Sequence, residues 1–112
     1  MNKIIRPLIV IALYASITAC SNETEISYRQ DVKPIFEKNC FPCHQAGGVG
    51  EVASGLNLET HENLMRGTRN GSVIQSGLSY ASTLQVLVEH KADATINMPK
   101  GKNKLPKREI EL

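Results

Sequence analysis

The residues with the most distinctive chemistry in this chain of 112 residues are two cysteines and a histidine that stand close together. They lie in the segment Cys40-Phe41-Pro42-Cys43-His44. Two thiols at this spacing can form thioether bonds with the two vinyl groups on one edge of a porphyrin. A histidine directly after the second thiol can supply an imidazole nitrogen to the iron. The spacing therefore predicts that Cys40 and Cys43 attach a c-type haem and that His44 is an axial ligand.

Two other kinds of site use the same residues. In thioredoxin-like dithiol enzymes a proline also precedes the second cysteine, but there the pair opens a helix after a buried β-strand. Here the apolar residues at positions 32, 35, 36 and 40 have helical spacing. A zinc site of Cys40, Cys43, His44 and His61 would lack a second paired cluster. Haem attachment is therefore the expectation, and a thiol–disulfide enzyme stays open as the less favoured alternative.

Four residues come into consideration as the ligand on the opposite side of the iron: His61, Met65, His90 and Met98. Met98 has polar neighbours and precedes Pro99, which disfavours a helix at the residue before it, so core packing does not explain this methionine. Met65 falls in a short predicted helix, where packing explains it, and both histidines are expected to be exposed. Met98 is therefore the predicted sixth ligand. A histidine ligand and an open site are the alternatives.

The first twenty residues have the features of an export signal. Two basic residues precede ten apolar ones from Leu8 to Ile17, a stretch too short to cross a bilayer of roughly 30 Å as a helix. The following Thr18-Ala19-Cys20 resembles the lipobox of bacterial lipoproteins, in which the cysteine becomes the lipidated first residue. The resemblance implies a signal peptide over 1–19, a lipid on Cys20 and a flexible tether over 20–27. It implies a location on the periplasmic side of the bacterial cell envelope, anchored to a membrane.

The charge of the chain excludes one class of function. There are 13 Lys and Arg against 11 Asp and Glu, and the two basic residues of the export signal account for the difference. A neutral domain gives no electrostatic argument for binding nucleic acid. Basic residues nevertheless gather around Met98, where only Asp93 opposes them: Lys91, Lys100, Lys102, Lys104, Lys107 and Arg108. They are either an ordinary solvated surface or a region that attracts an acidic redox partner.

The elements that position these residues are predicted to be helices of a single domain. Apolar periodicity, Pro34 in a first helical turn and Thr60 as an N-cap favour helices near 31–39, 60–66, 82–90 and 106–112, without a sheet. With two Phe and no Trp, the core lacks large side chains that a haem would replace. Ten apolar residues are expected around it: Val32, Ile35, Phe36, Leu56, Leu58, Leu64, Val73, Leu84, Leu87 and Val88. The glycine-rich segment Gly47–Gly50 is expected to be a loop close to the porphyrin edge.

The segment from Tyr28 to Phe36, together with the haem motif after it, resembles the start of small class-I-type cytochrome c domains. The planctomycete-type subgroup is the most similar, because it has the same acidic residue, proline and isoleucine before the haem motif. Ser54–Thr60 resembles the Gly-Leu-x-Leu segment of that subgroup, and Met98-Pro99 resembles its axial methionine loop. The resemblance covers residues 28–112. It is weaker at the end, where the last helix of the subgroup usually runs two or more turns further.

This resemblance implies an all-α fold, in which a small cytochrome c-like helical domain is wrapped around one covalently bound haem c with His44 and Met98 as axial ligands. It implies a one-electron carrier rather than an enzyme, with periplasmic or membrane-associated redox proteins as partners. A haem-based ligand sensor or a peroxidase-like enzyme with an open sixth site is the alternative function. A periplasmic thiol–disulfide oxidoreductase is less favoured.

Overall fold

A computed structural model of the protein describes residues 25–112. The expected signal peptide and the lipid attachment at Cys20 lie outside the described residues. From residue 25 onward every regular element is helical, and the one strand-like pairing is an isolated bridge between Thr68 and Gly71. The predicted all-α fold is therefore confirmed. None of the described helices is long and apolar enough to cross a membrane.

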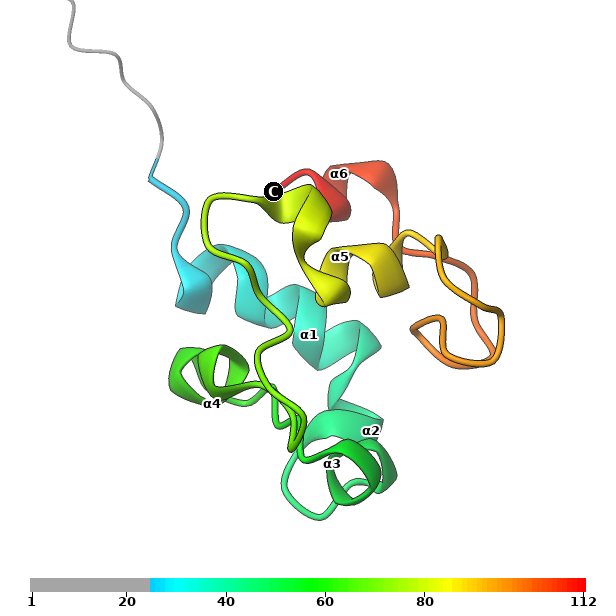
Figure 1. Ribbon diagram of the computed structural model, residues 1–112. Coiled ribbons are helices and arrows are strands. Elements are labelled where there is room, and N and C mark those ends of the chain that lie inside the picture. Colours follow the sequence, from blue (N-terminus) through cyan, green and yellow to red (C-terminus); the bar gives the residue numbers. More distant parts are fainter. Residues whose placement is uncertain (1–24) are drawn as a thin grey trace, which may run out of the picture.

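Short helices alternate with extended segments and turns (Figure 1). A π-helical turn over Tyr28–Val32 continues directly into α1, and the remaining helices follow in chain order. Their bounds are α1 Lys33–Asn39, α2 Phe41–His44, α3 Val49–Ser54, α4 His61–Arg66, a 3-10 turn over Ser79–Ala81, α5 Thr83–Val88 and α6 Lys107–Ile110. All four predicted helices are present, and the last two are each three residues shorter than the predicted ranges 82–90 and 106–112.

A reciprocal cap stabilises the beginning of the π-helical turn that leads into α1. The Ser27 hydroxyl accepts a hydrogen bond from the Gln30 amide at 3.4 Å, and the Asp31 carboxylate accepts one from the Ser27 amide at 2.7 Å. Pro34 stands in the first turn of α1, where a missing amide hydrogen removes no bond within the helix. The helix therefore begins close to where its sequence predicts, and it buries Phe36.

Helix α3 was not predicted. The sequence indicated a loop over Gly47–Gly50, whereas the helix begins at Val49. Gly48 has an extended backbone (φ −69°, ψ 150°) and is the N-cap of the helix. Gly55 ends the helix with φ 82°, the left-handed conformation in which glycine commonly ends helices. Since a glycine inside a helix costs about 1 kcal/mol relative to alanine, contacts at both ends of α3 must offset Gly50.

The core contains one cluster of buried residues: Phe36, Cys40, Leu56, Leu58, Leu64 and Val73. Leu58 is the most enclosed, with 1% of its surface exposed, and its carbonyl accepts a hydrogen bond of 2.9 Å from the Tyr28 hydroxyl. Four of the ten apolar residues expected around a haem are half-buried: Val32, Ile35, Leu84 and Leu87. They line cavities of the domain, and this leaves part of each side chain uncovered.

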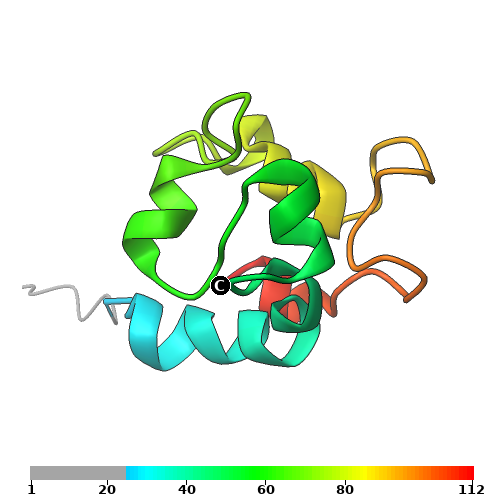
Figure 2. The same ribbon diagram turned by 90° about the horizontal axis from the view of Figure 1, so that it is seen from below.

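The segment between α5 and α6 projects from the body of the helices. Figure 1 and the perpendicular view in Figure 2 both show it (orange) on the side opposite α4. Two main-chain hydrogen bonds join this segment to α5: the Met98 amide donates to the Leu87 carbonyl at 3.1 Å, and the Leu105 amide donates to the Val88 carbonyl at 3.3 Å. The end of α5 is therefore the base of the segment that carries Met98.

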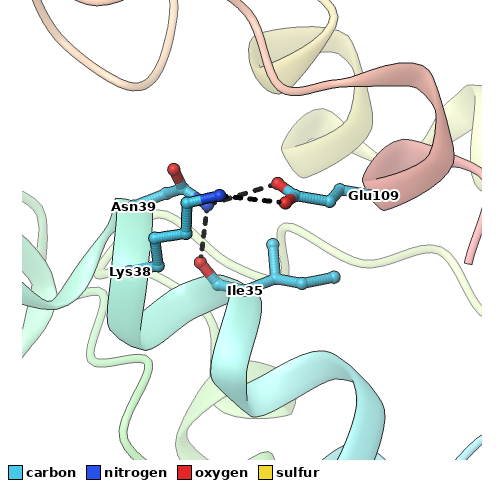
Figure 3. Close-up of polar contacts among 4 residues, drawn as sticks. All are labelled: Ile35, Lys38, Asn39 and Glu109. Atoms are coloured by element: carbon cyan, nitrogen blue, oxygen red, sulfur yellow. Dashed lines mark hydrogen bonds and ion pairs between the residues drawn. The ribbon is translucent and has the colours of Figure 1, made fainter.

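Helix α6 is short, yet polar contacts join it to α1 (Figure 3). The Glu109 carboxylate accepts hydrogen bonds from Lys38 at 3.3 Å and from Asn39 at 3.4 Å, and Asn39 also donates to the Ile35 carbonyl at 2.8 Å. Because the Lys38 side chain is largely exposed, its ion pair contributes at most about 1 kcal/mol. Ile35 and Ile110 line one apolar cavity of about 410 Å³. The first and last helices therefore face each other across this cavity.

Candidate functional site

The haem motif consists of Cys40, which joins α1 to α2, and of the single turn of α2 itself. The Cys40 carbonyl accepts hydrogen bonds from the Cys43 amide at 3.1 Å and from the His44 amide at 2.9 Å. These bonds close one helical turn, so the two thiols and the imidazole project toward one side of the chain. Cys40 is buried, Cys43 is half-buried, and both are free thiols.

His44 is held in one orientation by the segment after α3. Its Nδ1 lies 3.0 Å from the Leu56 carbonyl oxygen, and its own carbonyl accepts a hydrogen bond of 2.8 Å from the Leu58 amide. Because a carbonyl only accepts, Nδ1 carries the proton and Nε2 keeps a free lone pair. A histidine that ligates a metal is usually fixed in this way through its other ring nitrogen. The buried imidazole is therefore prepared to bind iron through Nε2.

Two glycines allow α3 to lie directly against the haem motif. A Cβ atom at Gly50 would come within 2.8 Å of Cε1 and Nε2 of His44, and a Cβ atom at Gly48 would overlap the Cys43 carbonyl. The sequence correctly indicated a close passage of the backbone here, but the neighbour is the haem motif itself. The space beside the imidazole exists because Gly50 has no side chain.

Two residues that the sequence analysis did not single out fix the ends of the segment around His44. The Arg69 guanidinium donates to the Ala53 carbonyl at 2.8 Å and to the Val52 carbonyl, which caps the end of α3. The Glu59 carboxylate accepts hydrogen bonds from the Ala46 amide at 3.0 Å and from Asn57 at 2.9 Å. These bonds lower the pKa of Glu59, those from Asn57 most strongly. The contacts of Glu59 and Arg69 span 13 and 17 positions, so no local pattern reveals them.

Two adjoining cavities meet at the predicted site. One has a volume of about 410 Å³ and the other about 360 Å³. Four residues line both of them: Cys40, His44, Ser54 and Met98. Six of the ten apolar residues expected around a haem line the second of these cavities: Leu56, Leu58, Val73, Leu84, Leu87 and Val88. Cavities of this size are typical of ligand and cofactor sites.

Met98 is the one of the four candidate sixth ligands that lines these two cavities. Its side chain is half-buried, whereas Met65 is exposed. His61 is exposed and lies edge-on to Tyr28, with ring centroids 5.3 Å apart. His90 was expected to be exposed and is instead half-buried, because its Nε2 lies 3.0 Å from the Met98 carbonyl oxygen. The structure thus brings Met98 to the cavities that contain His44.

The alternatives to haem attachment gain no support from this geometry. Burial raises the pKa of the Cys40 thiol to about 11, although Lys102 lowers it slightly. A dithiol enzyme needs a thiolate, so its reactive cysteine has a depressed pKa. Between residues 25 and 112, no three or more His, Cys, Asp or Glu side chains gather as a metal site would require. Two thiols on one side of a turn, an imidazole with a free Nε2 and the space left by Gly50 fit a covalently attached haem.

Replacing Gly50 by alanine is expected to displace the His44 imidazole, because the new methyl group would overlap the ring. In a bacterial host with cytochrome c maturation, the ratio of attached haem to polypeptide should fall several-fold. The matched control is Val52→Ala on the same helix, since the Val52 side chain is 60% exposed and lines neither cavity. Haem content and absorption spectrum identical in Gly50→Ala and the control would contradict this role.

Comparison with known proteins assigns the family. The family model described as Planctomycete cytochrome C matches residues 40–101, from the first cysteine of the haem motif to just beyond Met98. The curated proteins and the solved structures contain no match to the chain. A cytochrome c domain implies a covalently bound haem c and haem-based electron transfer. Since the matched segment is more than half of the sequence, the chain belongs to the planctomycete cytochrome c family.

Proposed function

We propose that this cytochrome c domain is a one-electron carrier with a single haem c, attached at Cys40 and Cys43 and held axially by His44 and Met98. The observation that carries the proposal is that Met98 lines both cavities that contain Cys40 and His44. Haem bound there supplies the one-electron redox chemistry of its iron. The chain supplies the ligands, their orientation and the surroundings that set the reduction potential.

Each part of the site has a physical task in such a carrier. The hydrogen bond from His44 Nδ1 to the Leu56 carbonyl keeps the imidazole in the ligating tautomer. A thioether from Met98 favours reduced iron and raises the potential. The leucine and valine side chains of the second cavity exclude water, which also favours the less charged, reduced state.

The lining of the cavities favours a carrier over a sensor or a peroxidase-like enzyme. Proton transfer at an open sixth site is most often carried out by a histidine, or by a carboxylate, beside the iron. Among the described residues that line the two cavities, His44 is the sole histidine and there is no carboxylate. The side chain at the position for a sixth ligand is a thioether, which neither gives nor takes a proton near neutral pH. We therefore propose that the domain is not an enzyme by itself.

An absorption spectrum of the exported protein tests this function. Colour that stays with the polypeptide through acid–solvent extraction is expected, because thioether bonds from Cys40 and Cys43 resist it. The reduced protein should show a low-spin spectrum, and the oxidised protein should show the red charge-transfer band of an iron–thioether bond. A colourless protein from a host with working cytochrome c maturation would overturn the proposal.

Met98→Ala is the matched variant for this experiment. The charge-transfer band should disappear, and the reduction potential should fall by about 0.1–0.2 V, a fraction of the roughly 0.8 V range over which axial ligands set haem potentials. Met65→Ala is the control, because Met65 is exposed and lines neither cavity. If Met98→Ala leaves the charge-transfer band, the reduction potential and the binding of external ligands unchanged, Met98 is not the ligand.

The partner that we propose is a periplasmic or membrane-associated redox protein with an acidic docking surface. Lys100 and Lys102 line the first cavity and are exposed, so they place positive charge at its mouth. Val49 lines the same cavity with 74% of its surface exposed. An apolar centre beside positive charge is typical of surfaces that attract a complementary partner.

Reversing both charges with Lys100→Glu and Lys102→Glu is expected to slow oxidation of the reduced protein by hexacyanoferrate(III), an anionic probe, by about tenfold at low salt. High salt should reduce the difference, since it screens exposed charges. The control changes two arginines outside the cavities, Arg29→Glu and Arg66→Glu, for the same net charge. Equal rates in the two double variants would argue against a local steering field.

We also propose that lipid on Cys20 anchors the protein on the periplasmic side of the envelope, with residues 20–27 as the tether. The lipobox resemblance of Thr18-Ala19-Cys20 supports this. Cells grown with a labelled fatty acid should incorporate the label into the wild-type chain and not into Cys20→Ala. Equal labelling of both chains would show that the lipid, if there is one, is attached elsewhere.

A further inference from the structure

The backbone at the end of α5 has an unusual residue. His90 has φ 56°, and it is the one non-glycine residue with a positive φ in residues 25–112. It follows α5 in a turn closed by the Lys91 amide, which donates to the Val86 carbonyl at 3.0 Å, and by its own amide, which donates to Leu87 at 3.1 Å. Helices usually end in this way with glycine, because an L side chain disfavours the left-handed region. A histidine here points to a role for its side chain.

The side chain of His90 contacts the residue proposed as the sixth ligand. Its Nε2 lies 3.0 Å from the Met98 carbonyl oxygen. Since a carbonyl only accepts, Nε2 is the donor. The Met98 amide donates in turn to the Leu87 carbonyl. One polar main-chain group of Met98 is therefore bonded to the last turn of α5, and the other is bonded to His90, two residues beyond the end of α5.

Apart from the turn that ends α5 and the bond from the Leu105 amide to the Val88 carbonyl at the far end of the projecting segment, the other hydrogen bonds of this segment are internal to it. Asn97 exchanges two hydrogen bonds of 3.1 Å with the main chain of Ala92, and Asp93 accepts hydrogen bonds from the amide and hydroxyl of Thr95. These bonds shape the segment but do not fix it to a helix. Segments that project and have few tertiary contacts open locally at low cost. The position of Met98 over the cavities therefore depends on its two bonds to the α5 end.

We propose that His90 is a positioning residue that holds the Met98 thioether at the cavities opposite His44. The inference rests on the proposed function, in which Met98 is the sixth ligand. By donating to the Met98 carbonyl from a turn fixed on α5, His90 reduces the number of arrangements that the main chain of Met98 can adopt. A ligand held in this way leaves the iron less often, so external ligands gain access to the iron less often.

Two variants of the haem-loaded full-length protein separate the side chain from the backbone. His90→Gly keeps a residue that favours the left-handed conformation and removes the donor. His90→Gln keeps an N–H donor of similar reach. The control is His61→Gln, since His61 is exposed and lines neither cavity. The measurements are the iron–thioether band, the rate at which imidazole binds to the oxidised protein, and hydrogen exchange of the Met98 amide.

In His90→Gly we expect imidazole to bind about five- to tenfold faster, the factor that corresponds to loss of one hydrogen bond. The Met98 amide should exchange faster as well. His90→Gln should restore most of both values, and His61→Gln should match the wild type. Two results would overturn the positioning role. One is that imidazole binding and Met98 amide exchange in His90→Gly are as slow as in the wild type. The other is that both are faster in His90→Gly and that His90→Gln does not restore them.

The same measurements distinguish this failure from a failure of the proposed function. If the wild-type protein lacks the iron–thioether band, Met98 is not the ligand, and the ligation and the role of His90 fall together. If the wild type has the band and His90→Gly keeps it with unchanged imidazole binding, the ligation stands and the positioning role alone is refuted. Amide exchange then reports whether the hydrogen bond exists without a role at the iron.

Discussion

The hydrogen bond between His44 Nδ1 and the Leu56 carbonyl is the interaction on which the site depends. It sets the tautomer of the imidazole, and it joins the haem motif to the segment that leads from α3 to α4. The Leu58 amide strengthens this connection by donating to the His44 carbonyl. Bringing the two segments this close requires glycines in α3 and fixed ends for the intervening chain, which Arg69 and Glu59 provide.

The cavities explain how so small a domain obtains a core. Between residues 25 and 112, Phe36 is the one large aromatic side chain that is buried, and several aliphatic side chains face the cavities rather than each other. A flat apolar group attached at Cys40 and Cys43 would cover these surfaces and contribute the burial that the side chains do not. Stability of the fold is then linked to the attached group, because its apolar faces are removed from water against these side chains only when the chain is folded.

Much of the site could be predicted from local sequence, and the rest depends on contacts that local sequence does not encode. The haem motif, the all-α fold and the helices at 31–39 and 60–66 follow from spacing, caps and periodicity. Helix α3 was missed because its glycines lower helix propensity and its stabilising contact from Arg69 comes from outside the helix. His90 was predicted to be exposed because helix periodicity says nothing of a side chain that turns toward a later segment. Leu84 and Leu87 are half-buried because they line a cavity. Helix periodicity marks such residues as apolar and inward-facing, but it does not distinguish a packed core from the wall of a cavity.

The placement of Lys100 and Lys102 at the mouth of the first cavity has an electrostatic consequence for the direction of electron flow. Two ammonium groups disfavour the oxidised iron, which has one more positive charge than the reduced iron, so the free domain retains its electron more firmly. An acidic surface that docks against these lysines removes part of that effect. If the proposed acidic acceptor docks there, its association would therefore lower the reduction potential of the haem, and the electron would be easier to release in the complex than in solution.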